Sequence, residues 1–136
     1  MKKTLILFSV AVLIFAFSAC GEKFDSADDY ADRIYTYEGE GCGGDFSVVL
    51  NEDGTFSYYE GFFSSYIGLG TWTSEGEIIT LSDDPEFGYE LVNRFRMKNG
   101  DLVYVSEGSS GFIYVDVLDG EEFHGEKFDP PKNTEE

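Results

Sequence analysis

The chain has 136 residues, of which 42% are hydrophobic and 17% aromatic, a composition sufficient for one packed domain and untypical of a disordered chain. Its formal net charge is −18, from 27 acidic and 9 basic residues. Because such a surface repels nucleic-acid phosphates, the charge argues against a nucleic-acid-binding function.

The N-terminal segment has the organisation of an export signal. Lys2 and Lys3 precede an uncharged run over residues 4–21 that is rich in Leu, Ile, Val and Phe and ends in small residues. The strongly apolar part, residues 5–17, is shorter than the roughly 20 residues that a membrane-spanning helix needs. We therefore expect a signal peptide over residues 1–19, with an uncleaved N-terminal membrane helix as the alternative.

This signal ends in FSAC, residues 17–20, which resembles the lipobox of bacterial lipoproteins. The resemblance implies that the thiol of Cys20 receives a diacylglyceryl group, with fatty acids such as palmitate, and that Cys20 becomes the mature N-terminus. Two or three acyl chains give stable anchoring, whereas one chain alone is marginal. We expect residues 20–29 to be a lipidated tether that holds the protein at the extracytoplasmic face of the cell membrane.

The second cysteine and the C-terminal end carry weaker signals. Cys42 lies among glycines in EGEGCGGDF, and an acylated Cys20 would leave it without a disulfide partner. We expect a partly buried small residue at a turn, with a redox or catalytic thiol as the alternative. The sequence of residues 129–136, DPPKNTEE, predicts a disordered acidic tail.

Residues 30–128 consist of short strand-like segments separated by turn signals. The hairpin patterns are FSVVL-NEDG-TFSYY, GTWTSEGEIITLS, ELVNRFRMKNGDLVYVS and GFIYVDVLDGEEF, and ADRIYTYEGE adds one more extended segment before them. The expected turns are at Asp53-Gly54, Glu75-Gly76, Asn99-Gly100 and Asp119-Gly120. The Asn-Gly pair is the strongest two-residue hairpin signal among them.

These segments predict an all-β domain of eight or nine short strands. Alternation supports the prediction, because Phe95 and Met97 fall on one face of their segment and Arg94 and Arg96 on the other. A meander of this many strands must protect its edges. We predict closure into a small antiparallel up-and-down barrel, with a two-sheet β-sandwich as the alternative.

Three phrases carry a more specific resemblance: LNEDGTFSYYEG, SSYIGLGTW and EGSSGFIYV. Over residues 35–123 the chain is similar to a group of small exported lipoproteins of Gram-positive gut bacteria, and to extracellular tail domains of membrane metallopeptidases of the β-lactam-sensing type. The resemblance implies a lipocalin-like small barrel and no assigned activity.

The side chains available for chemistry argue against an enzyme. His124 is the only histidine, so a site built from several histidines is excluded, and a single histidine at a strand end is typically structural. Glu60 and Glu107 occupy equivalent places in two similar loops and are the pair to consider for glycoside hydrolysis. LSDDPE and NEDG offer oxygens for calcium, but neither has the spacing of a calcium-binding loop, so we expect no metal and no cofactor.

A binding module therefore remains the expected function. An eight-stranded barrel can just hold a small ligand, and GFFSSYIGLG places Phe62, Phe63 and Tyr66 in a glycine-bounded loop, with Trp72 following as a core anchor. We expect these three loop aromatics to bind a small apolar ligand at the barrel mouth. The alternative is contact with another envelope protein or a structural role, and calcium binding or glycoside chemistry are remote alternatives.

Overall fold

The computed structural model describes residues 21, 23–39, 46–60, 67–87 and 89–128. Within these residues it contains one short 3-10 helix and eight strands. Their bounds are η2 Ala27–Tyr30, β1 Arg33–Tyr37, β2 Phe46–Leu50, β3 Thr55–Glu60, β4 Ile67–Glu75, β5 Ile78–Asp83, β6 Val92–Lys98, β7 Asp101–Val105 and β8 Glu122–Lys127.

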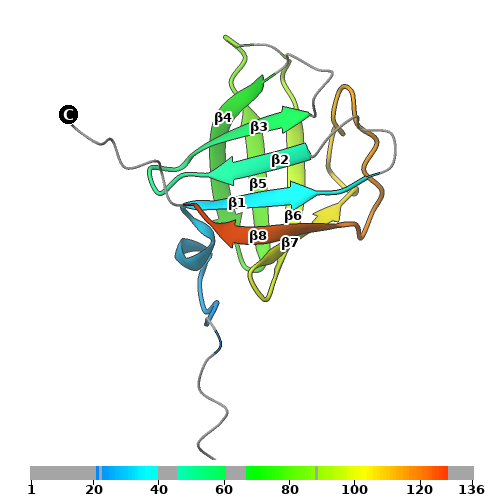
Figure 1. Ribbon diagram of the computed structural model, residues 1–136. Helices are drawn as coiled ribbons and strands as arrows, with labels where there is room; N and C mark the ends of the chain where they lie inside the picture. The colour runs from blue at the N-terminus through cyan, green and yellow to red at the C-terminus, as the bar shows by residue number, and fades with distance from the viewer. Residues whose placement is uncertain (1–20, 22, 40–45, 61–66, 88, 129–136) are drawn as a thin grey trace, which may run out of the picture.

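The eight strands form one closed barrel in which each strand pairs antiparallel with the next along the chain (Figure 1). Closure comes from β1 and β8, where Ile34 lies opposite Glu126 and Thr36 opposite His124. The predicted up-and-down barrel is therefore confirmed with eight strands, and the two-sheet sandwich is wrong.

Three of the four expected hairpins are present. The chain turns between β2 and β3, between β4 and β5, and between β6 and β7, as expected. The β4–β5 turn lies one residue later than expected, at Gly76 and Glu77, because Glu75 still pairs with Ile78. At the β6–β7 turn, Asn99 and Gly100 have φ angles of 48° and 87°. A two-residue type I′ hairpin turn requires positive φ at both positions, which is why Asn-Gly is favoured there.

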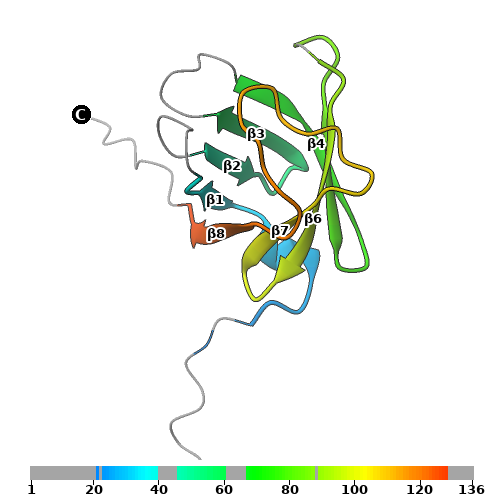
Figure 2. The same ribbon diagram turned by 90° about the vertical axis from the view of Figure 1, so that its right-hand side faces the viewer.

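The fourth expected hairpin is wrong. Residues 106–121 contain no strand, and only β8 remains of the pair that GFIYVDVLDGEEF predicts. The alternation in this segment is nevertheless real, since Val115 is buried while Tyr114 and Asp116 are exposed. The segment lies across one end of the barrel, as the gold and orange trace in Figure 2 shows. Contact with a packed surface on one side gives the same alternation as a strand.

Aromatic rings pack the barrel interior. Phe46 is central, with ring centroids 4.7 Å from Phe112, 5.4 Å from Phe123 and 5.9 Å from Tyr58. Leu50, Leu81, Leu102, Ile79 and Val48 fill the spaces between the rings. Because each buried aromatic removes roughly 150–250 Å² from water, this cluster is the main source of stability.

Two glycines make room for interior tyrosines. A Cβ at Gly68 in β4 would meet the ring of Tyr58, and a Cβ at Gly125 in β8 would meet the ring of Tyr35 and the carbonyl of Gly100. A tyrosine on one strand thus occupies the space that a side chain on a neighbouring strand would need.

Different elements cover the two ends of the barrel (Figure 1). At the end where β1 begins, η2 places the buried Tyr30 beneath the strands, with its ring 6.5 Å from that of Tyr35. At the end where β1 finishes, residues 106–121 bring Phe112 onto Phe46. The described part of the chain therefore forms a filled barrel with a cover at each end.

Candidate functional site

Most of the residues that the sequence singles out for function lie outside the described residues. These are the acylation candidate and the loop aromatics, Cys20, Phe62, Phe63 and Tyr66, and also the second cysteine, Cys42. Their expected roles therefore stay predictions. Trp72 is described: it is half-buried, packs against the edge of the core, and donates from Nε1 to the carbonyl oxygen of Asn51 at 2.9 Å.

The two glutamates considered for glycoside chemistry have different environments. Glu60 at the end of β3 is only 2% exposed, and its Oε1 accepts a hydrogen bond from the Tyr114 amide at 3.0 Å. Its Oε2 has no hydrogen-bond partner among the described residues. Burial raises the pKa of this carboxyl, and the nearby Asp83 raises it further. Glu107 is exposed in the turn after β7.

The calcium candidates use their oxygens in local hydrogen bonds. Asp53 Oδ1 accepts from the amide and the hydroxyl of Thr55, at 3.0 and 2.6 Å. Asp84 Oδ1 accepts from the Glu86 amide at 2.9 Å. These contacts are typical of turns in which a carboxylate bonds the backbone two residues on.

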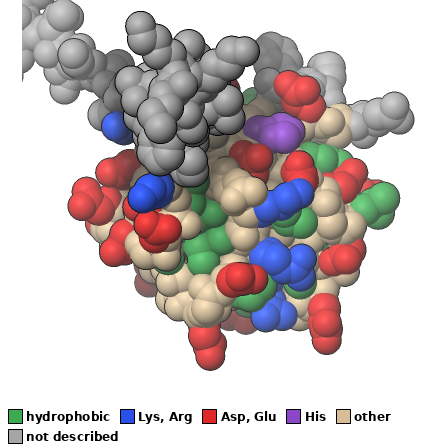
Figure 3. All heavy atoms as spheres, turned by 90° about the horizontal axis from the view of Figure 1, so that it is seen from below, with side chains coloured by type: hydrophobic (Ala, Val, Ile, Leu, Met, Phe, Trp, Pro, Cys, Tyr) green, Lys and Arg blue, Asp and Glu red, His purple; other side chains and the backbone are tan. Residues whose placement is uncertain are grey.

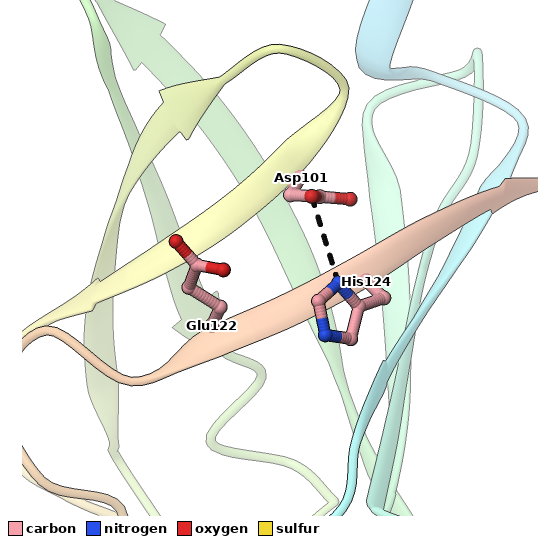
Figure 4. A group of neighbouring side chains, drawn as sticks. All are labelled: Asp101, Glu122 and His124. Carbon is pink, nitrogen blue, oxygen red and sulfur yellow. Dashed lines mark ion pairs between the residues drawn. The ribbon is translucent and has the colours of Figure 1, made fainter.

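One group of three metal-ligand side chains is present in the described part of the chain. Asp101 at the start of β7 and Glu122 and His124 on β8 each offer a ligand atom, and these atoms all lie within 4.8 Å of one another (Figure 4). His124 Nδ1 is 3.6 Å from Asp101 Oδ2. The histidine is exposed, and Figure 3 shows it on the molecular surface among acidic and basic side chains.

Strand register brings this group together. Glu122 and His124 are two residues apart, so both side chains point outward from β8. Leu102 pairs with Phe123 in the β7–β8 ladder, which places Asp101 opposite His124 on the same outer face. The sequence interpretation of His124 as an isolated residue missed its neighbours. The Glu-x-His spacing was the one available signal.

Two further contacts hold the carboxylates of the group. The Gly125 amide donates to Asp101 Oδ1 at 2.9 Å, which leaves Oδ2 directed at His124. Lys98 Nζ forms an ion pair with Glu122 Oε1, and this hydrogen bond raises the pKa of the lysine. The surface group thus contains two carboxylates and one imidazole, and the Lys98 ammonium is bound to one of the carboxylates.

The described residues line several hollows, including one lined by the start of β1 and Lys127 and one by Thr55, Gly70 and Ser82. Another lies between η2 and the β6–β7 turn, where Phe24, Tyr30 and Met97 meet Glu77 and Lys98. Among the described residues, no helix is both long enough and apolar enough to cross a bilayer.

Comparison of the chain with protein-family models, with curated proteins and with solved structures found no match.

Proposed function

We propose that the protein is a lipid-anchored extracytoplasmic module that binds without catalysis, and that its partner is another envelope protein that contacts the outside of the barrel. The anchor in this proposal is the acylated Cys20, and its support is the order of charged, apolar and small residues that ends in FSAC. A small ligand at the barrel mouth is the second candidate.

The packed interior is the observation that favours a contact at the outer surface over a ligand inside the barrel. Phe46, Tyr58 and Phe123 are each at most 2% exposed, and they meet ring to ring across the barrel. A ligand that entered the described interior would have to displace these rings, at a cost of several kcal/mol for each buried aromatic. Binding at the outer surface requires no such rearrangement.

An outward apolar strip on β3 and β4 supports a protein partner. Tyr59 lies opposite Ile67 in the strand register, and Leu69 follows on the same outward face of β4. Ile67 is 54% exposed and Leu69 39%. Apolar side chains that are adjacent on an exposed sheet face are typical of protein contact sites.

Site-specific photo-crosslinking in the native host tests the partner. A crosslinking residue at position 67 should give one adduct of defined protein mass. The same residue at Thr73, which lies on the same strand and outward face but away from the strip, should give none. Equal labelling from both positions, or native mass spectrometry that finds a bound small molecule and no protein adduct, would overturn the proposed partner.

Intact-mass analysis of protein from the host membrane tests the anchor. The expected mass corresponds to a chain that begins at an acylated Cys20, and Cys20→Ser should release the protein into the medium. A chain that retains Met1, or one with an unmodified Cys20, would contradict the proposed location.

A further inference from the structure

The outer face of β7 and β8 carries three side chains that bind metals in other proteins. Imidazole nitrogen and carboxylate oxygen are both ligands of zinc, and sites with three protein ligands leave a fourth position for water. Asp101, Glu122 and His124 supply one nitrogen and two carboxylates from two adjacent strands. The rest of the described surface gives no second group of this kind.

We propose that Asp101, Glu122 and His124 bind one divalent transition-metal ion of the Zn²⁺ class on the outside of the barrel. This inference goes beyond the proposed binding function and does not depend on it. The imidazole favours zinc and its neighbours in the transition series over calcium, which takes oxygen ligands alone.

The separations of the ligand atoms suit such an ion. Two ligands at about 2.0 Å from a tetrahedral zinc ion lie about 3.3 Å apart. His124 Nδ1 and Asp101 Oδ2 are already 3.6 Å apart, and the widest separation in the group is at most 4.8 Å. The β7–β8 ladder fixes the backbone positions of the three residues. Small side-chain rotations alone would therefore bring the ligand atoms to the separation that zinc requires.

The surroundings orient one ligand in advance. The Gly125 amide donates to Asp101 Oδ1, so the carboxylate is turned with Oδ2 toward the imidazole. Hydrogen bonds of this kind orient ligands in metal sites and contribute to affinity. The formal net charge of −18 also raises the local concentration of divalent cations.

Lys98 gives the proposal a distinctive consequence. Its ammonium holds Glu122 Oε1 in the metal-free protein, so it competes with the ion for that carboxylate. Removal of the ammonium should therefore tighten metal binding, whereas removal of any ligand should weaken it. A purely structural ion-pair cluster would bind no metal with or without Lys98.

Calorimetric titration of the full, untagged chain in detergent with Zn²⁺ tests the site. We expect one ion per chain. Asp101→Asn and His124→Asn should each weaken binding at least tenfold, and Lys98→Gln should strengthen it several-fold. Glu126→Gln is the matched control, because Glu126 lies two residues after His124 on the same outward face of β8, and it should change affinity less than twofold.

The single histidine provides an independent readout. Its imidazole NMR signals belong to one residue, so Zn²⁺ should shift them and Co²⁺ should broaden them in the wild-type protein. Ca²⁺ should do neither at the same concentration. Absence of heat and of any imidazole shift with Zn²⁺ would overturn the proposal, and so would equal affinities for wild type and His124→Asn. The exchanged side chains are at least partly exposed, so we expect each variant to fold. Melting curves of each variant check this.

Discussion

The two ends of the barrel are closed by different physical means. At the η2 end, Tyr30 is 3% exposed and its polar groups are bonded: its Oη accepts from the Gly100 amide at 3.1 Å, and its carbonyl oxygen accepts from Tyr35 Oη at 2.6 Å. Phe24 packs on the Tyr30 ring at 5.3 Å. Burial at this end leaves these polar groups satisfied, which is the stable arrangement.

At the opposite end, residues 106–121 lie over the barrel without strand pairing. Phe112 fills the space above Phe46, and the Asn93 side chain bonds both the amide and the carbonyl of Gly111 at 3.2 Å. At this end one oxygen of the buried Glu60 carboxyl, Oε2, has no hydrogen-bond partner among the described residues. Burial of a charge with partial compensation costs free energy.

The difference predicts an order of opening. The η2 end combines ring packing with bonded polar groups, whereas the other end combines ring packing with a buried acidic group. We therefore expect residues 106–121 to open locally before the η2 end does, and loss of Tyr30 to weaken the whole barrel.

Tyr30→Ala should have the largest effect. It removes a buried ring and the acceptor of the Gly100 amide, and we expect the free energy of unfolding to fall by about 3–5 kcal/mol. Urea denaturation measures this loss. Phe87→Ala is the control, since that ring is 62% exposed, and it should cost about 0.5 kcal/mol or less. Equal losses for the two variants would show that Tyr30 is not part of the stabilising core.

Phe112→Ala should have a smaller and more local effect. The ring is only partly buried, so we expect a loss of about 2 kcal/mol. Hydrogen exchange should become faster at Gly111 and Tyr114, while the Gly100 amide at the opposite end keeps its protection. Faster exchange at both ends alike would contradict the separate behaviour of the two covers.

Local signals made most of the fold predictable. The three confirmed hairpins each rest on a turn sequence flanked by alternating residues, and Asn99-Gly100 needs no information from the rest of the chain. Barrel closure followed from the need to protect strand edges. The fourth hairpin failed because the alternation around Val115 records contact with the barrel end and not strand pairing.

The surface site was not predictable in the same way. Asp101 and His124 meet only because β7 pairs with β8 in one register. The turn signal at Asp119-Gly120 predicted a hairpin within residues 111–123, so it did not indicate that β8 pairs with β7. The buried state of Glu60 likewise depends on residues 113–115, which are distant in sequence. The expected roles of Cys20 and the loop aromatics concern residues outside those described, so they stay predictions.

Tyr30→Phe isolates the polar part of the η2 end. The ring stays, but the buried Gly100 amide loses the oxygen that accepts its hydrogen bond. We expect a loss of about 1–2 kcal/mol, because an unsatisfied buried donor costs most of its desolvation free energy. Thermal unfolding measures the change. Tyr59→Phe, on the outer face of β3, is the matched hydroxyl deletion, and a loss as large as that of Tyr30→Phe would contradict the assigned role.

Glu60→Gln changes the buried carboxyl at the end that residues 106–121 cover. It should have the smallest effect, a change of about 1 kcal/mol or less in the free energy of unfolding.

Burial raises the folded-state pKa of Glu60 above its usual value of 4.5, so the folded protein binds more protons than the unfolded chain just above that pH. The contribution of Glu60 to stability therefore falls as pH rises through this window. Urea denaturation between pH 4 and about 7 should show a smaller decline for Glu60→Gln than for wild type. Glu107→Gln, at an exposed carboxyl, should keep the wild-type slope, and parallel curves for all three proteins would show that Glu60 carries no electrostatic cost.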